Sequence, residues 1–214
     1  MRFVAPLLPL PQQWTLVDHD ADLLGAVRIP DIDGVRVQTL TLDLADPRVL
    51  DAEVDLVSMQ ALLDLVSEEW LDHLVEWLVQ RRLPLLAALS VDGRVDWSPP
   101  DPRDVQVQSA FRAHQLTDRG FGASPGPQAA PLLGERLAAA GYRVEVAQTD
   151  WQIPSKSTQM LQEMVNGTAQ AAEEACHGIT SEAAVASWRA DRLAAVTAEK
   201  LSLRVGHLDL LAVP

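Results

Sequence analysis

Trp14-Thr15-Leu16-Val17-Asp18-His19-Asp20 is the stretch that decides the fold of this chain, because it is a short apolar run that ends on acids. Side chains that are apolar on both faces up to the carboxyl end are typical of a buried parallel strand. A carboxylate at that end is placed to accept hydrogen bonds from the hydroxyls of a nucleotide ribose. The simpler alternative is that Asp18 and Asp20 cap the helix predicted for 21–27. The sequence leaves both interpretations open.

The strand-then-acid pattern occurs a second time. After a turn at 31–34, residues 35–42 form another β-prone run, which Asp43 follows. Further strands are predicted at 54–59 and at 85–91, where the Asp92-Gly93 turn would close the strand. A helix at 68–82 lies between them, with Ser67 as its N-cap and an apolar stripe of Trp and Leu. This alternation predicts a parallel sheet with helices on both faces.

Residues 97–213 are predicted to contain loops, further helices and two more strands. A loop is predicted at 97–104, a helix at 105–116, a glycine-rich loop at 120–126, and a helix at 132–140. Residues 142–149 alternate as a strand, and 203–213 form a final strand. Between these two strands, 154–200 predict a helical hairpin whose first helix is interrupted near Asn166-Gly167 and which we expect to cover a ligand cleft. Residues 2–8 resemble the end of a helix.

Composition narrows the class of protein. The 214 residues carry a formal net charge of −13, so nucleic acid is not an expected partner. No apolar run reaches the length of a membrane span, and the start lacks a signal-peptide cleavage site. The only cysteine, Cys176, excludes an internal disulfide and fits a reducing cytoplasm. A homo-oligomer stays an open option.

In this order of elements, the whole chain resembles a class I S-adenosylmethionine-dependent methyltransferase. The resemblance implies one domain over 1–214, with an α/β, Rossmann-like, mostly parallel sheet. It also implies that the last two strands, 142–149 and 203–213, form an antiparallel pair at one edge. The activity implied is methyl transfer from S-adenosylmethionine to a small-molecule acceptor.

Carried onto this sequence, the resemblance assigns a cofactor-binding set. Asp18 would hold the ribose hydroxyls, and His19 would lie beside the adenine. Asp43 and Leu44 would contact the adenine edge. The methionine part of the cofactor would lie over the end of the strand at 54–59, at Ser58, Met59 and Gln60.

The sequence departs from the family at its start. The family's first, central strand and its glycine-rich loop, of the form acid-x-Gly-x-Gly, would precede Met1 and are missing. The clustered glycines at 120–126 follow the fifth strand instead. Three explanations stay open: the start codon is misplaced, the gene is truncated, or the protein is degenerate. The expected consequence is weak cofactor binding, because only glycine lets a backbone approach the methionine end so closely.

The candidate catalytic residues are His114, Gln115 and Asp118, in a segment after the fifth strand where the family usually builds its acceptor pocket. His114 would be a base or would orient the acceptor. The alternative is that His114 packs half-buried on its helix and bonds a backbone carbonyl. His207 and Asp209, in the last strand, are expected to be structural, and Trp151 is expected in the core. No His or Cys spacing predicts a metal site.

Two other functions fit the same sequence. A non-catalytic methyltransferase-like subunit would explain the missing glycine loop directly. A nicotinamide-dependent enzyme would also use an acid at the end of its second strand. The antiparallel last pair argues against the nicotinamide enzyme.

Overall fold

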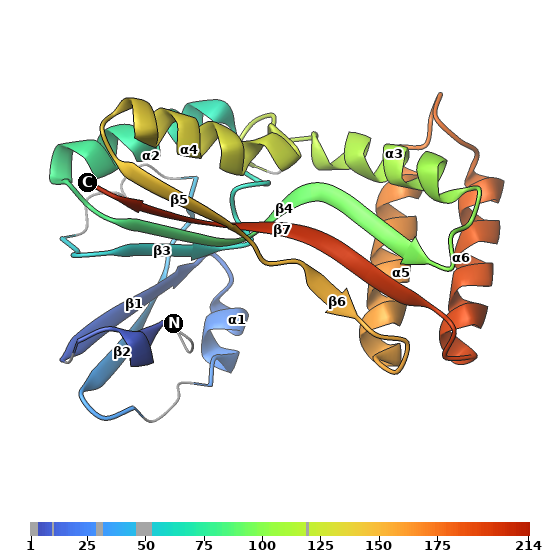
Figure 1. The fold of residues 1–214 in the computed structure, drawn as a ribbon, viewed down its shortest axis with the longest axis horizontal. Helices are drawn as coiled ribbons and strands as arrows, with labels where there is room; N and C mark the ends of the chain where they lie inside the picture. The colour runs from blue at the N-terminus through green and yellow to red at the C-terminus, as the bar shows by residue number, and fades with distance from the viewer. Residues whose placement is uncertain (1–3, 10, 29–31, 46–52, 119) are drawn as a thin grey trace. The chain divides into compact units, whose positions relative to one another are not determined.

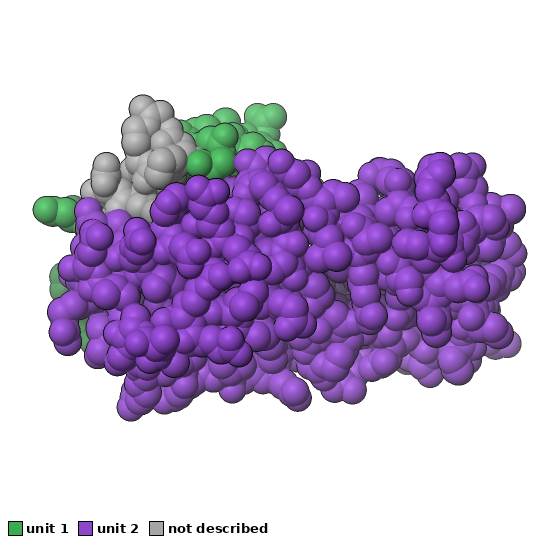
Figure 2. Space-filling view, turned by 90° about the horizontal axis from the view of Figure 1, so that it is seen from above, with its two compact units in different colours: residues 1–54 green, residues 55–214 purple. Residues whose placement is uncertain are grey.

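Residues 1–54 and 55–214 form two compact units in a computed structural model of the chain (Figure 2). The structure describes residues 4–9, 11–28, 32–45, 53–118 and 120–214. That the whole chain is one domain stays a prediction.

The unit at 1–54 contains two parallel strands. β1 (Gln12–Asp18) pairs with β2 (Val35–Thr41) over its full length, with Gln12 opposite Val35 and Asp18 opposite Thr41. Between them lies the short helix α1 (Ala21–Ala26). A single 3-10 turn, η1 (Ala5–Leu7), precedes β1. The strand prediction around Asp18 is therefore confirmed, and part of the helix end predicted at 2–8 lies outside the described residues.

The unit at 55–214 contains a five-stranded sheet in the order β3-β4-β7-β5, with β6 also paired to β7. β3 and β4 are parallel, whereas β7 runs antiparallel to β4, β5 and β6. The antiparallel pairing of the last two predicted strands, which the resemblance implied, is confirmed for β5 and β7. The strand bounds are β3 (Val57–Gln60), β4 (Leu85–Ser98), β5 (Arg143–Gln148), β6 (Trp151–Ile153) and β7 (Ser202–Val213).

Two helices pack at the end of this sheet where β3 lies (Figure 1). α2 (Glu68–Arg81) begins at Ser67, whose hydroxyl accepts the Trp70 N–H at 3.2 Å, as the sequence predicted. α4 (Ala129–Ala139) packs on β5 and β7. The apolar side chains between these helices and the sheet are buried: Leu71, Leu74, Leu78, Leu85, Leu133, Leu137, Leu210 and Ala212.

A second cluster of buried residues fills the other end of β4 and β7. Here α3 (Asp104–Gln115), α5 (Thr158–Glu174) and α6 (Glu182–Thr197) pack together, and β4 and β7 run on beside them (Figure 1). Trp97 of β4 meets Trp188 of α6 edge to face, with ring centroids 5.5 Å apart. The helical insert thus shares a core with α3 and with strands of the sheet. That it covers a ligand cleft stays a prediction.

Two local predictions are wrong. β4 does not end at Asp92-Gly93 but continues to Ser98, with irregularities after Ala87 and after Val91. Pairing with β7 carries the strand through the Asp-Gly signal, and the Asp92 carboxylate accepts the Arg94 N–H at 2.9 Å inside the strand. α5 likewise runs without a break through Asn166 and Gly167. The Asn166 side chain is held from outside, by Arg189 Nε at 2.8 Å.

Candidate functional site

Asp18 and Asp43 follow the carboxyl ends of two paired parallel strands. Asp18 is the last residue of β1, and Asp43 lies two residues beyond Thr41, the β2 residue that pairs with Asp18. The prediction that both acids lie at the carboxyl edge of one parallel sheet is confirmed. Ligands of open α/β sheets bind outside this edge.

Local hydrogen bonds already engage one oxygen of each acid. Asp18 Oδ1 accepts the Asp20 N–H at 3.0 Å and lies 3.4 Å from Nδ1 of His19. Asp43 Oδ1 accepts the Ala45 N–H at 2.9 Å. Asp20, not Asp18, caps α1, because its Oδ1 accepts the backbone N–H groups of Asp22 and Leu23. The capping alternative is therefore correct for Asp20 alone.

The Asp18 side chain nevertheless fits a hydroxyl-bearing ligand. It is 41% exposed, and its second oxygen, Oδ2, has no bonding partner among the described residues. His19 is 80% exposed beside it. Asp43 is also exposed, and Leu44 is half-buried. The four residues that the resemblance assigned to ribose and adenine thus lie at one end of the β1–β2 pair.

The three residues assigned to the methionine end lie on β3, in the other unit. Ser58 and Gln60 share a face of β3, and Gln60 Nε2 donates to Ser58 Oγ at 3.1 Å. Met59 is half-buried opposite Ala87 of β4. Directly after β3, Ala61 has φ +50°, and Leu89 of β4 has φ +57°. Left-handed residues other than glycine are uncommon and gather at functional sites.

The loop after α3 matches the family's glycine motif in sequence, but not in its position along the chain. It reads Asp118-Arg119-Gly120-Phe121-Gly122, so it matches acid-x-Gly-x-Gly although it follows a helix rather than a strand. Asp118 Oδ1 accepts the N–H groups of both Gly120 and Gly122, at 2.7 and 2.8 Å. Because those N–H groups are bonded to their own aspartate, they do not form a cradle for a ligand anion. Asp118 orders this loop, and its catalytic assignment stays a prediction.

His114 is half-buried on α3, as the alternative interpretation expected, and its ring contacts a carboxylate of α5. Its Nε2 lies 2.8 Å from Oε2 of Glu174, the last residue of α5, and its side chain is 19% exposed. A carboxylate that fixes one ring nitrogen also fixes the orientation of the imidazole, as in catalytic His–carboxylate pairs. Glu174 could not be predicted as a partner of His114, because residues 60 apart in the chain carry no local signal. Gln115, the next residue, is half-buried.

His207 of β7 and the neighbouring Asp150 have hydrogen-bond partners within the protein. The buried His207 ring stacks on Trp151 at 4.9 Å between centroids, and its Nδ1 lies 3.1 Å from the Val205 carbonyl oxygen. Beside it, Asp150 accepts bonds from Arg204 and Arg94, which hold the pKa of Asp150 at about 2. Such a satisfied ion-pair cluster needs no ligand to explain it.

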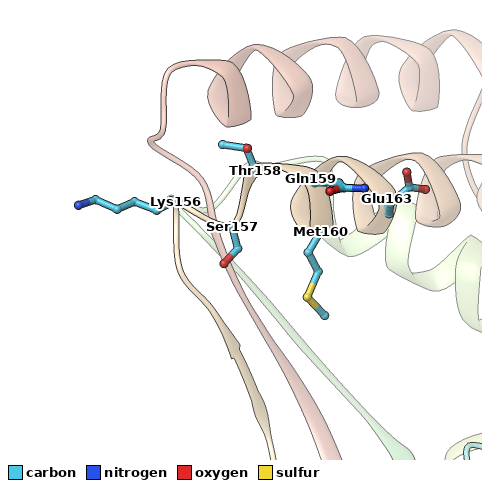
Figure 3. A pocket seen from close by; sticks show the side chains of 6 residues that line it. All are labelled: Lys156, Ser157, Thr158, Gln159, Met160 and Glu163. Carbon is cyan, nitrogen blue, oxygen red and sulfur yellow. The ribbon is translucent and has the colours of Figure 1, made fainter. Parts of the chain in front are cut away.

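One open pocket lies at the N-terminus of α5, lined by 156–160 and Glu163 (Figure 3). Figure 3 shows the Lys156 side chain pointing away from the helix. No predicted site residue lines this pocket. Among the described residues no group of three or more His, Cys, Asp or Glu could hold a metal ion, and none of the described helices is long and apolar enough to cross a membrane.

No family model matches this sequence, and no curated protein matches it. Among solved structures, a protein from Anaeromyxobacter dehalogenans described as a type II methyltransferase is 14% identical, with a TM-score of 0.47 over 99% of this chain and 93% of its own. A SAM-dependent methyltransferase from Geobacter sulfurreducens, in complex with S-adenosyl-L-homocysteine, is 14% identical, with a TM-score of 0.38 over 99% and 88%. The cyclopropane synthase MmaA2 from Mycobacterium tuberculosis is 10% identical, with a TM-score of 0.39 over 94% and 78%. Likenesses of this size do not assign a reaction to this chain.

Proposed function

We propose that this protein binds S-adenosylmethionine and transfers its methyl group to a small-molecule acceptor. The observation that carries the proposal is the strand order of the unit at 55–214, in which the final strand, β7, lies antiparallel between β4 and β5. This is the antiparallel last pair that the resemblance to class I methyltransferases implies. The parallel β1–β2 pair, with an acid after each strand, supports the same assignment.

Each proposed cofactor-binding residue offers a group that suits one part of S-adenosylmethionine. The Asp18 carboxylate would accept the ribose hydroxyls through Oδ2, which has no other partner among the described residues, while Oδ1 keeps its bond from Asp20. Asp43 and Leu44 would face the adenine edge, and the exposed His19 ring would lie beside it. Gln60 and Ser58 offer an amide and a hydroxyl to the methionine amino and carboxylate groups.

Methyl transfer from S-adenosylmethionine requires few chemical groups of the protein. Bound S-adenosylmethionine supplies a methyl group that its sulfonium already activates, so the protein contributes alignment and exclusion of water. A base is needed only for an acceptor that must lose a proton. We assign that role to His114, whose ring Glu174 orients. Gln115 and Asp118 complete the proposed acceptor side, Asp118 by ordering the loop that holds Gly120 and Gly122.

A net charge of −13 argues that the acceptor is not a nucleic acid. The site is instead proposed for a small molecule that is neutral or cationic. Cytoplasmic location, which fits the lone cysteine, and a homo-oligomeric state are further parts of this proposal.

A methyltransferase-like subunit that binds without catalysis is the second candidate. The observation that favours it is the loop at Asp118, whose glycine N–H groups are bonded internally and so do not replace the family's glycine cradle. Cofactor binding without turnover over a panel of amine, hydroxyl and thiol acceptors would favour this candidate. Tritium transfer from labelled S-adenosylmethionine to any of them would favour the enzyme.

Calorimetric titration with S-adenosylhomocysteine tests the proposal. Asp18→Asn keeps an Oδ1 that accepts the Asp20 N–H but removes the charged second oxygen, and it should weaken binding about ten-fold or more. Asp43→Asn should weaken binding less. Asp33→Asn is the matched control, because Asp33 is exposed in the turn before β2, at the opposite end of the same strand pair. Equal affinity in all three variants would refute the proposed cofactor site.

We further propose that a parallel strand and a glycine-rich loop from outside residues 1–214 complete the site. β1 is paired with β2 alone and β3 with β4 alone among the described strands, so each has an edge that a strand could join. The apolar β1 side chains, Leu16 and Val17, are only half-buried there. A chain extended by its upstream coding sequence should bind the cofactor more tightly and melt at a higher temperature. Unchanged affinity and melting would contradict this completion.

A further inference from the structure

A bulge bends β4 at the point where the parallel β3–β4 pair ends. Ala87 pairs with Leu210 of β7, but the next paired residue of β4 is Ser90, opposite Leu208. Ala88 and Leu89 of β4 therefore face the single β7 residue Asp209. Bulges of this kind re-aim side chains and are over-represented beside active sites.

Leu89 occupies an unfavourable backbone conformation in this bulge. Its φ of +57° lies in the left-handed region, which glycine ordinarily fills, and Leu89 is half-buried. A strained residue persists only where its surroundings hold it. The contact that holds Leu89 is a side chain from the neighbouring strand, because Asp209 Oδ1 accepts the Leu89 N–H at 2.9 Å.

The same aspartate oxygen also accepts the Thr149 hydroxyl at 2.9 Å. Asp209 thus joins β4, its own strand and the residue just after β5. Asp209 was expected from the sequence to be structural, and these bonds explain its place in a strand that is otherwise largely apolar.

The bulge continues directly into the end of β3. Ala88, beside Leu89, is opposite Gln60, and its carbonyl accepts the N–H of Ala61 at 3.1 Å. Ala61 is the second left-handed residue of this edge, with φ +50°. A continuous series of contacts therefore runs from Asp209, through the bulge, to the backbone that presents Gln60.

We infer that Asp209 is a positioning residue, which fixes the Leu89 bulge and through it the backbone of Gln60 and Ala61 for cofactor binding. The inference rests on the proposed function, in which the end of β3 contacts S-adenosylmethionine. Asp209 itself touches no ligand in this account.

Amide hydrogen exchange and S-adenosylhomocysteine titration test this role in the full chain. Asp209→Ala should lose most of the exchange protection of Leu89 and Ala61, and should weaken S-adenosylhomocysteine affinity about ten-fold, because the competent conformation becomes a minor one. Thr149→Val is the matched control, since it removes the other bond to the same Oδ1 and leaves the Leu89 bond in place. It should change neither readout.

The two readouts separate this inference from the proposed function. Unchanged protection of Ala61 in Asp209→Ala would overturn the inference whether or not the protein binds S-adenosylhomocysteine. Lost protection with unchanged affinity would show a purely structural role and would overturn it too. Failure of the unaltered chain to bind S-adenosylhomocysteine would instead refute the proposed function. If Asp209→Ala does not fold, Asp209→Asn replaces it, and its neutral oxygen should lower both readouts to a smaller extent.

Discussion

Replacing Arg192 by leucine should severely destabilise the part of the unit at 55–214 where α3, α5 and α6 pack together. The Arg192 side chain is 4% exposed, and its Nη2 donates to both oxygens of Asp104 at 2.5 Å, while Nη1 donates to the Pro99 carbonyl at 2.7 Å. Leucine would leave Asp104, itself buried, with only its bonds from Trp188 Nε1 and the Asp101 N–H. Breaking a buried ion pair by removing one partner costs about 3–5 kcal/mol.

For a chain of this length the loss corresponds to a fall in Tm of roughly 6–20 °C. Urea unfolding followed by tryptophan fluorescence measures it, because Trp97 and Trp188 lie beside Arg192 in the same core. Arg136→Leu is the control, since that side chain is 25% exposed and pairs with the exposed Glu68 and Asp72, so its loss should cost about 1 kcal/mol or less. A cost for Arg192→Leu no greater than the control's would refute the reasoning.

Two further predictions concern the ion-pair cluster of the sheet and the helix beside it. Gly206→Ala should lower the free energy of unfolding by about 1–3 kcal/mol, because the added methyl group would overlap the Asp92 carboxylate. Gly167→Ala should raise the free energy of unfolding by about 0.5–1 kcal/mol, because Gly167 lies in the middle of α5 with open space around it. Equal effects of the two substitutions in chemical denaturation would contradict this. Bonds from Arg204 above all lower the pKa of Asp150 from 3.8 to about 2, so the stability they provide is present above pH 3.8 and is lost as the pH falls toward 2. Asp150→Asn should remove that part of the acid dependence in unfolding curves measured from pH 5 to 2, and an unchanged dependence would exclude Asp150 as its source.

The sequence predicted most helices and strands, because their signals are local. The acid after an apolar run located the end of β1, and Ser67 located the start of α2. Where long-range contacts override a local signal, the prediction was wrong. The Asp92-Gly93 turn signal lies inside β4 because pairing with β7 continues past it. Asn166-Gly167 lies inside α5, where Arg189 binds the Asn166 side chain.

The same difference between local signals and long-range contacts applies to the candidate site. Asp18 and Asp43 were predictable, because parallel strands bring their carboxyl ends to one edge. The Asp209 bond to Leu89 and the Glu174 bond to His114 join residues 120 and 60 positions apart, so no spacing in the chain indicates them. At 118–122 a local sequence motif is misleading instead. Its residues match the family's glycine loop, but the N–H groups of Gly120 and Gly122 donate to the Asp118 carboxylate.

A crystal structure of the chain with S-adenosylhomocysteine tests the central claim most directly. The account predicts the ribose hydroxyls within hydrogen-bond distance of Asp18 and the adenine beside Asp43 and Leu44. Ligand bound elsewhere, such as in the pocket at the start of α5, or no ligand density at saturating concentration, would contradict it.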